Sequence, residues 1–113
     1  MTSSSVPPMT IRRRAVDGVT VMSVVGELVD ATAPALARRL IAVDGPLILD
    51  LTRCRFVTAP GCAPLFAYRR SGPVAVVCER RSAVETALLR ITAGSLPIHD
   101  RVADAVDGLR LAH

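Results

Sequence analysis

The sequence predicts an α/β sandwich with a mixed, mainly parallel sheet, a hairpin at its N-terminal edge and about four helices. Three observations support this prediction. Apolar runs of strand length alternate with segments of helical periodicity, two of those runs are apolar almost throughout, and an Asp-Gly pair joins the first two strands. Strands that alternate with helices pair in parallel through right-handed crossovers. The expected order of elements is β-β-α-β-α-β-α-β-α.

The first two strands are expected at residues 11–15 and 19–25, on either side of Asp17 and Gly18. An Asp-Gly pair between two alternating or apolar runs is the strongest short-range signal for a hairpin. Three consecutive arginines at 12–14 lie in the first strand. We therefore place that strand at an edge of the sheet, where charged side chains also discourage pairing with other chains.

The first helix is expected over residues 33–41, shortly after the second strand ends at residues 26–28. Its apolar residues recur at helical spacing, and Thr32 precedes it as a possible cap. Pro34 is tolerated in the first turn, because the N–H that proline lacks would be unpaired there in any case. Residues 44–46, with the sequence Asp-Gly-Pro, end the helix.

The remaining elements continue the alternation. They are a buried strand at 47–51, a helix opening at 58–61 and running to Arg70, a buried strand at 74–78, a helix from Ser82 to Gly94, a short strand at 96–98 and a helix capped by Asp100. Apolar runs without alternation are typical of parallel strands covered on both faces. Ser82 and Glu85 have the spacing of a capping box, in which each side chain accepts a hydrogen bond from a free amide.

Length and composition indicate a single folded domain at residues 10–113, preceded by a disordered leader at 1–9. The chain has 113 residues, half of them hydrophobic, with three aromatic side chains, so the core should be aliphatic. The leader is polar and lacks the apolar stretch of a signal peptide. No apolar run approaches the roughly 18 residues that a membrane span needs. Three cysteines without a C-x-x-C pair favour reduced thiols in the cytoplasm.

Candidate chemistry is sparse. Cys62 stands at an expected helix start, where the helix dipole could lower a thiol pKa, and His99 is the one imidazole away from the chain end. A Cys-dependent enzyme is therefore a weak alternative, and a core-facing Cys62 is the favoured interpretation. All 14 basic residues are arginines, and they are dispersed. Without an aromatic stacking platform they do not indicate nucleic-acid binding.

Five segments in this order resemble the STAS domain, and within it the bacterial anti-sigma factor antagonists. They are GEL at 26–28, TAPAL at 32–36, LILDL at 47–51, FVTAPG at 56–61 and the capped helix from Ser82. The resemblance extends over about residues 10–110. It implies a small binding module that holds an anti-sigma factor, a kinase-like ATP-binding protein, so that a sigma factor is released.

The resemblance also implies a contact face. In that family it includes the loop after the GEL segment and the loop and helix that carry an Asp-Ser-Ser-Gly-like motif, whose second serine is phosphorylated to break the complex. Carried over to this chain, the expected partner-binding residues are Glu27, Asp30, Thr32, Thr58, Ala59, Pro60, Gly61 and Cys62.

The sequence departs from the family at the switch. Aligned on Gly61, the phosphoacceptor position falls on Pro60, which has no hydroxyl, and the aspartate after GEL falls on Val29, next to Asp30. Thr58 is the one hydroxyl left in the loop, and we expect it to be a helix N-cap, with phosphoacceptor as the lesser alternative. Binding is therefore expected not to be switched by phosphorylation at the usual site.

The sequence thus predicts a non-enzymatic bacterial protein of the cytoplasm that binds an anti-sigma factor. The alternative is a soluble STAS subunit of another assembly, such as a transporter complex. We expect no cofactor, no metal, no direct nucleic-acid contact and no membrane insertion, and a monomer or weak homodimer.

Overall fold

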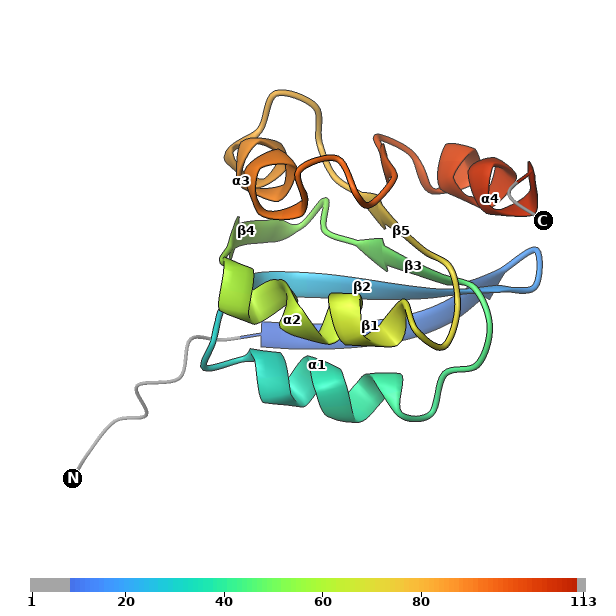
Figure 1. The fold of residues 1–113 in the computed structure, drawn as a ribbon, viewed down its shortest axis with the longest axis horizontal. Coiled ribbons are helices and arrows are strands. Elements are labelled where there is room, and N and C mark those ends of the chain that lie inside the picture. The colour runs from blue at the N-terminus through green and yellow to red at the C-terminus, as the bar shows by residue number, and fades with distance from the viewer. Residues whose placement is uncertain (1–8, 112–113) are drawn as a thin grey trace.

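The computed structural model describes residues 9–111, and Figure 1 shows their arrangement. The elements in chain order are β1 (Met9–Val16), β2 (Val19–Leu28), α1 (Ala33–Leu40), β3 (Leu47–Asp50), β4 (Cys54–Val57), α2 (Ala59–Tyr68), β5 (Val74–Val77), α3 (Ala83–Thr92), β6 (Ile98–His99) and α4 (Val102–Leu111). The leader expected at residues 1–9 lies outside the described residues, except for Met9, which begins β1 instead.

The sheet is mixed and mainly parallel, as the sequence predicts. Its strand order is β1-β2-β3-β5-β6, with β1 antiparallel to β2 and the other pairs parallel. β1 therefore lies at the edge, where its arginines led us to place it. Asp17 and Gly18 both have positive φ, as a tight two-residue hairpin turn requires.

The expected order of elements lacked one strand, β4. The long strand β2 pairs with β3 along Thr20–Ser23 and with β4 along Gly26–Leu28. The short strands β3 and β4 thus pair with successive parts of the same strand, β2. β4 has four residues, of which the first and last are buried and the middle two are exposed. Its pattern is neither alternating nor continuously apolar, so neither strand signal is present in the sequence.

Helices cover both faces of the sheet, and two apolar cores result. α1, α2 and α3 pack on one face and α4 on the other (Figure 1). Successive residues of strand β3 contribute to both cores. Leu47 and Leu49 belong to the core beneath α1, α2 and α3, while Ile48 belongs to the core beneath α4. This two-sided burial confirms the interpretation of the apolar runs.

The third helix begins at the predicted cap. The hydroxyl of Ser82 accepts a hydrogen bond from the N–H of Glu85 at 3.1 Å. The carboxylate of Glu85 accepts one from the N–H of Arg81 at 2.8 Å, one residue before the amide that a standard capping box would use. Across residues 9–111, none of the helices has the length and apolar character that a membrane crossing demands.

Candidate partner-binding surface

The loop after β2 and the turn before α2 lie side by side at one edge of the sheet. Because β2 and β4 pair in parallel, both strands deliver the chain to the same edge. The N–H of Thr58, the first residue after β4, donates to the carbonyl oxygen of Leu28, the last residue of β2, at 3.0 Å. The two segments that the resemblance singled out are therefore held together by backbone contacts.

Gly61 sets how closely these segments approach. A Cβ atom at this position would lie 2.1 Å from the carbonyl oxygen of Leu28 and 2.7 Å from the backbone nitrogen of Val29. Both distances are far below van der Waals contact, and backbone atoms cannot rotate away as a side chain can. Only glycine allows the first turn of α2 to pack against the end of β2, so Gly61 has a structural role and is itself buried.

Thr58 caps α2, as the sequence predicts. Its backbone is extended, and its hydroxyl oxygen accepts a hydrogen bond from the N–H of Gly61 at 3.1 Å. Ala59 and Pro60 form the first turn, where the missing N–H of proline leaves no hydrogen bond unmade. Both of these residues are exposed. The turn is thus accessible and conformationally restricted at once.

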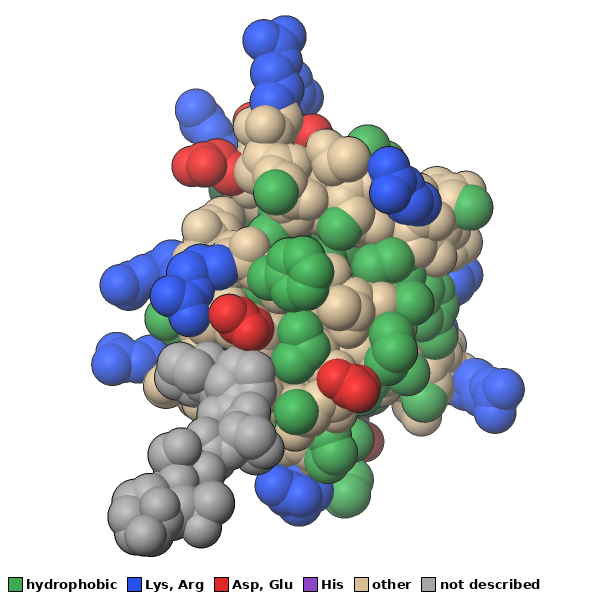
Figure 2. All heavy atoms as spheres, turned by 90° about the vertical axis from the view of Figure 1, so that its left-hand side faces the viewer, with side chains coloured by type: hydrophobic (Ala, Val, Ile, Leu, Met, Phe, Trp, Pro, Cys, Tyr) green, Lys and Arg blue, Asp and Glu red, His purple; other side chains and the backbone are tan. Residues whose placement is uncertain are grey.

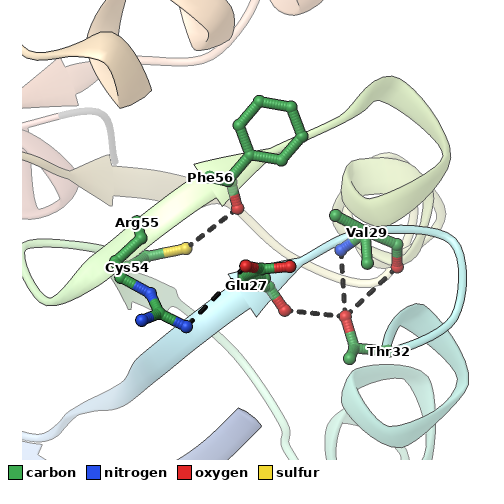
Figure 3. Close-up of polar contacts among 6 residues, drawn as sticks. All are labelled: Glu27, Val29, Thr32, Cys54, Arg55 and Phe56. Atoms are coloured by element: carbon green, nitrogen blue, oxygen red, sulfur yellow. Dashed lines mark hydrogen bonds and ion pairs between the residues drawn. The ribbon is translucent and has the colours of Figure 1, made fainter. Parts of the chain in front are cut away.

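Thr32 does not cap α1 with its side chain, contrary to our expectation. It occupies the N-cap position, but its hydroxyl accepts from the N–H of Val29 at 2.9 Å and donates to the carbonyl oxygen of Glu27 at 2.8 Å. Figure 3 shows this hydroxyl turned back onto the end of β2. With an exposed fraction of 3%, Thr32 shapes the loop and offers no side chain to a partner.

Acidic side chains give the surface its charge. Asp30 is exposed at the tip of the β2–α1 loop, and its carboxylate accepts a hydrogen bond from the N–H of Ala31 at 3.0 Å. Glu27 is half-buried and forms an ion pair with Arg55 at 3.7 Å (Figure 3). Beside them Phe56 is 52% exposed. Figure 2 shows this side of the molecule, with hydrophobic and acidic side chains near the middle and arginines toward the margin.

Cys62 is buried in the core and does not reach the surface. Burial raises the pKa of its thiol to about 11, and the nearby thiol of Cys54 adds to this shift. The net shift of this pKa is upward, opposite in direction to the lowering that a helix dipole would produce. The imidazole of His99 lies next to Gly108 of α4, on the other face of the sheet. Cys62 and His99 thus lie on opposite faces of the sheet and form no pair, and the interpretation of Cys62 as a core residue is confirmed.

The predicted residues accordingly divide into two groups. Glu27, Asp30, Ala59 and Pro60 lie at or near the surface, and Thr58 is partly exposed. Thr32, Gly61 and Cys62 are buried and hold the two loops in place. Sequence reasoning missed Phe56 as a surface residue, since an aromatic residue in an apolar segment normally indicates the core. Phe56 instead lies in the middle of β4, between the buried Cys54 and Val57, and its ring is left partly in solvent.

Comparisons with known proteins identify the fold. No protein-family model and no curated protein matches the chain. Among solved structures, the chain superimposes on an anti-sigma factor antagonist from Mycobacterium paratuberculosis with a TM-score of 0.77 and 27% identity, covering 96% of this chain and 99% of that one.

Two further structures share the architecture at lower identity. The anti-sigma factor antagonist SpoIIAA in its unphosphorylated form matches with a TM-score of 0.71 and 16% identity, over 89% of this chain and 96% of that one. An uncharacterised DUF3478-family protein with a SpoIIAA-like fold, from Shewanella loihica PV-4, matches with a TM-score of 0.54 and 14% identity, over 96% and 99%. The resemblance seen in the sequence is confirmed by the structure: this chain has the STAS fold of the anti-sigma factor antagonists.

Proposed function

We propose that this protein is a non-enzymatic, antagonist-like binding module of the bacterial cytoplasm that sequesters a kinase-type anti-sigma factor. The proposal places the contact on the surface formed by Asp30, Ala59 and Pro60, with Glu27 and Thr58 at its border. The observation that carries it is the close approach of the two loops at Gly61, which presents these exposed residues on one rigid surface.

Rigidity favours a binding role for this surface. Pro60 restricts the backbone of the turn, the hydroxyl of Thr58 fixes the start of α2, and the buried hydroxyl of Thr32 fixes the neighbouring loop. A surface that is already ordered loses little conformational entropy when a partner binds. The fold match to antagonists at nearly full length supports a protein partner of the same kind.

We further propose that phosphorylation at the usual position does not switch this module. That position is Pro60, which carries no hydroxyl. A phosphate adds a charge of about −1.5 to −2, which would change the surface beside Asp30, but proline gives it no attachment point. The hydroxyl of Thr58 is engaged in capping the helix, and we propose that it is not a substitute acceptor.

The proposal is tested by measuring the affinity of this protein for kinase-type anti-sigma factors purified from the same bacterium. We expect Asp30→Arg to weaken binding at least about tenfold, because a reversed charge at the centre of a contact both removes attraction and adds repulsion. Asp107→Arg is the matched control, since Asp107 is exposed on α4, on the other face of the sheet. Equal affinities for the two variants would refute the placement of the contact.

The identity of the captured partner separates this function from its alternative. Recovery of a kinase-type anti-sigma factor with the unaltered protein supports the proposal. Recovery of a membrane transporter component, with no affinity for any of the anti-sigma factors, would show instead a STAS subunit of another assembly.

A further inference from the structure

A hollow of about 440 Å³ lies at an edge of the sheet, and its lining residues come from β5, from the end of α4, from the end of α2 and from the segment around β6. It exists because β6 has two residues, which pair with Val76 and Val77 of β5. The first residues of β5, Val74 and Ala75, therefore have no strand beside them on that side. Its volume falls within the range of small-molecule sites, roughly 300 to 1,000 Å³.

The walls of the hollow are apolar. They consist of Pro73, Val74, Ala75, Pro97 and Leu109. Three of these residues are nearly inaccessible and form the floor, so an apolar group placed here would be removed from water on several sides. Burial of such a group contributes roughly 25 cal/mol for each Å² of apolar surface covered, which can hold a small molecule.

Polar groups lie at the border of this hollow, and Arg69 is the one formally charged residue among its described lining residues. Arg69, at the end of α2, contributes its guanidinium side chain, and Ser95 and His99 line the same space. Among residues 9–111, no carboxylate lines the hollow. Within residues 9–111 Arg69 takes part in none of the ion pairs, so no described carboxylate neutralises its charge.

Other hollows on the described surface differ from this one. A smaller hollow of about 250 Å³ is lined by Met9, Thr10, Val25 and Gly26 together with Arg53 and Arg55, of which Arg55 pairs with Glu27 at 3.7 Å. The neighbouring one contains Arg80 and Arg81, but three carboxylates line it as well, and Arg80 already pairs with Asp100 at 3.5 Å. The grooves between α1 and α2 are apolar, and the charged residue that lines them is the acidic Asp30. The hollow at Arg69 is larger than the one at Arg53 and, unlike the neighbouring one at Arg80, has no carboxylate among its described lining residues.

From this combination we infer that the hollow binds a small carboxylic acid with an apolar or aromatic body. The carboxylate is held by the guanidinium of Arg69, which offers a planar pair of donors that matches a carboxylate. The body packs against Val74, Pro97 and Leu109, and the imidazole of His99, placed beside Gly108, closes one end. This site is separate from the proposed docking surface and does not depend on it.

Titration of the ¹⁵N-labelled protein with benzoate and octanoate tests the inference. We expect NMR shift changes centred on residues 73–75, 95–99 and 108–109, saturating at millimolar concentrations. Benzamide and octanamide, which keep the body and lack the charge, should bind several-fold more weakly. Amides that bind as well as the acids would overturn the assignment of a carboxylate, and shifts that are absent or scattered over the surface would overturn the site.

Two arginine variants make the test specific. Arg69→Ala should weaken benzoate binding about fivefold, a value that allows for the solvent exposure of Arg69. Arg70→Ala is the matched control, because Arg70 is the adjacent exposed arginine and does not line the hollow. Equal effects of the two variants would show non-specific attraction to a basic surface and would refute the inference.

Discussion

Replacing Gly61 by alanine probes the contact on which the proposed docking surface rests. The new Cβ would lie 2.1 Å from the carbonyl oxygen and 2.4 Å from the carbonyl carbon of Leu28. Relief therefore requires the start of α2 to move away from the end of β2. That movement stretches the hydrogen bond from Thr58 to Leu28 and disturbs the N-cap of the helix.

The expected loss of stability follows from these contacts. Overpacking in a close-packed site costs about 1–3 kcal/mol, and the disturbed hydrogen bond and cap add about 1–2 kcal/mol. Alanine is the better helix former by about 1 kcal/mol, which offsets part of this cost. We therefore expect the free energy of unfolding to fall by about 1–4 kcal/mol, which corresponds to a decrease in Tm of roughly 4–20 °C.

Urea denaturation followed by circular dichroism measures this change. Gly108→Ala is the control, because Gly108 is also helical, but its new Cβ would meet the side chain of His99, at 3.2 Å, and no backbone atom. We expect that variant to stay within about 1 kcal/mol of the parent. A Gly61→Ala protein as stable as the parent would refute the claim that this contact fixes the two loops.

Further predictions concern caps, turns and thiols. Thr58→Ala should lower the free energy of unfolding by about 1 kcal/mol in urea denaturation, with Thr58→Ser close to the parent, because the cap at 3.1 Å needs a hydroxyl. Gly18→Ala should cost about 1 kcal/mol in the same assay through its positive φ alone, since no atom lies near the new Cβ; a neutral result would contradict this. Burial raises the pKa values of Cys62 and Cys78 to about 11 from 9.0. Above about pH 9 the folded state therefore retains thiol protons that the unfolded chain releases. The free energy of unfolding should be unaffected below about pH 9 and should fall as the pH rises toward 11. In Cys62→Ala this fall should be less steep, because one of the two buried thiols is missing. Iodoacetamide should label Cys62 in the folded protein far more slowly than in urea, and rapid labelling would refute its burial.

Much of the fold could be predicted because its signals are local. The Asp17-Gly18 turn, the apolar runs at 47–51 and 74–78 and the Ser82 cap each depend on residues close in the sequence. Strand β4 could not be predicted in this way. Its four residues include the exposed Arg55 and Phe56 in the middle. They form a strand because the second half of β2, which is distant in sequence, pairs with them.

The proximity of the two candidate loops could be predicted better than the structural roles of their residues. The resemblance singled out two loops that the structure holds side by side, and Thr58 caps its helix as expected. Thr32 has the same residue type and a similar place before a helix, yet its hydroxyl bonds to the preceding strand. The choice between these roles depends on how the loop folds back, which local sequence does not encode. Local sequence likewise does not show why glycine is needed at position 61, because the need arises from contact with the backbone of Leu28.

The central claim is that the surface at Asp30, Ala59 and Pro60 binds a kinase-type anti-sigma factor and is not switched by phosphorylation. The most direct test measures that affinity and the intact mass of this protein before and after incubation with the anti-sigma factor and Mg-ATP, alongside Pro60→Ser. We predict that the parent binds equally well before and after, with unchanged mass, while Pro60→Ser gains one phosphate and loses affinity. A phosphate on the parent protein, at Thr58 or elsewhere, together with release of the partner would contradict the account, as would the absence of any binding.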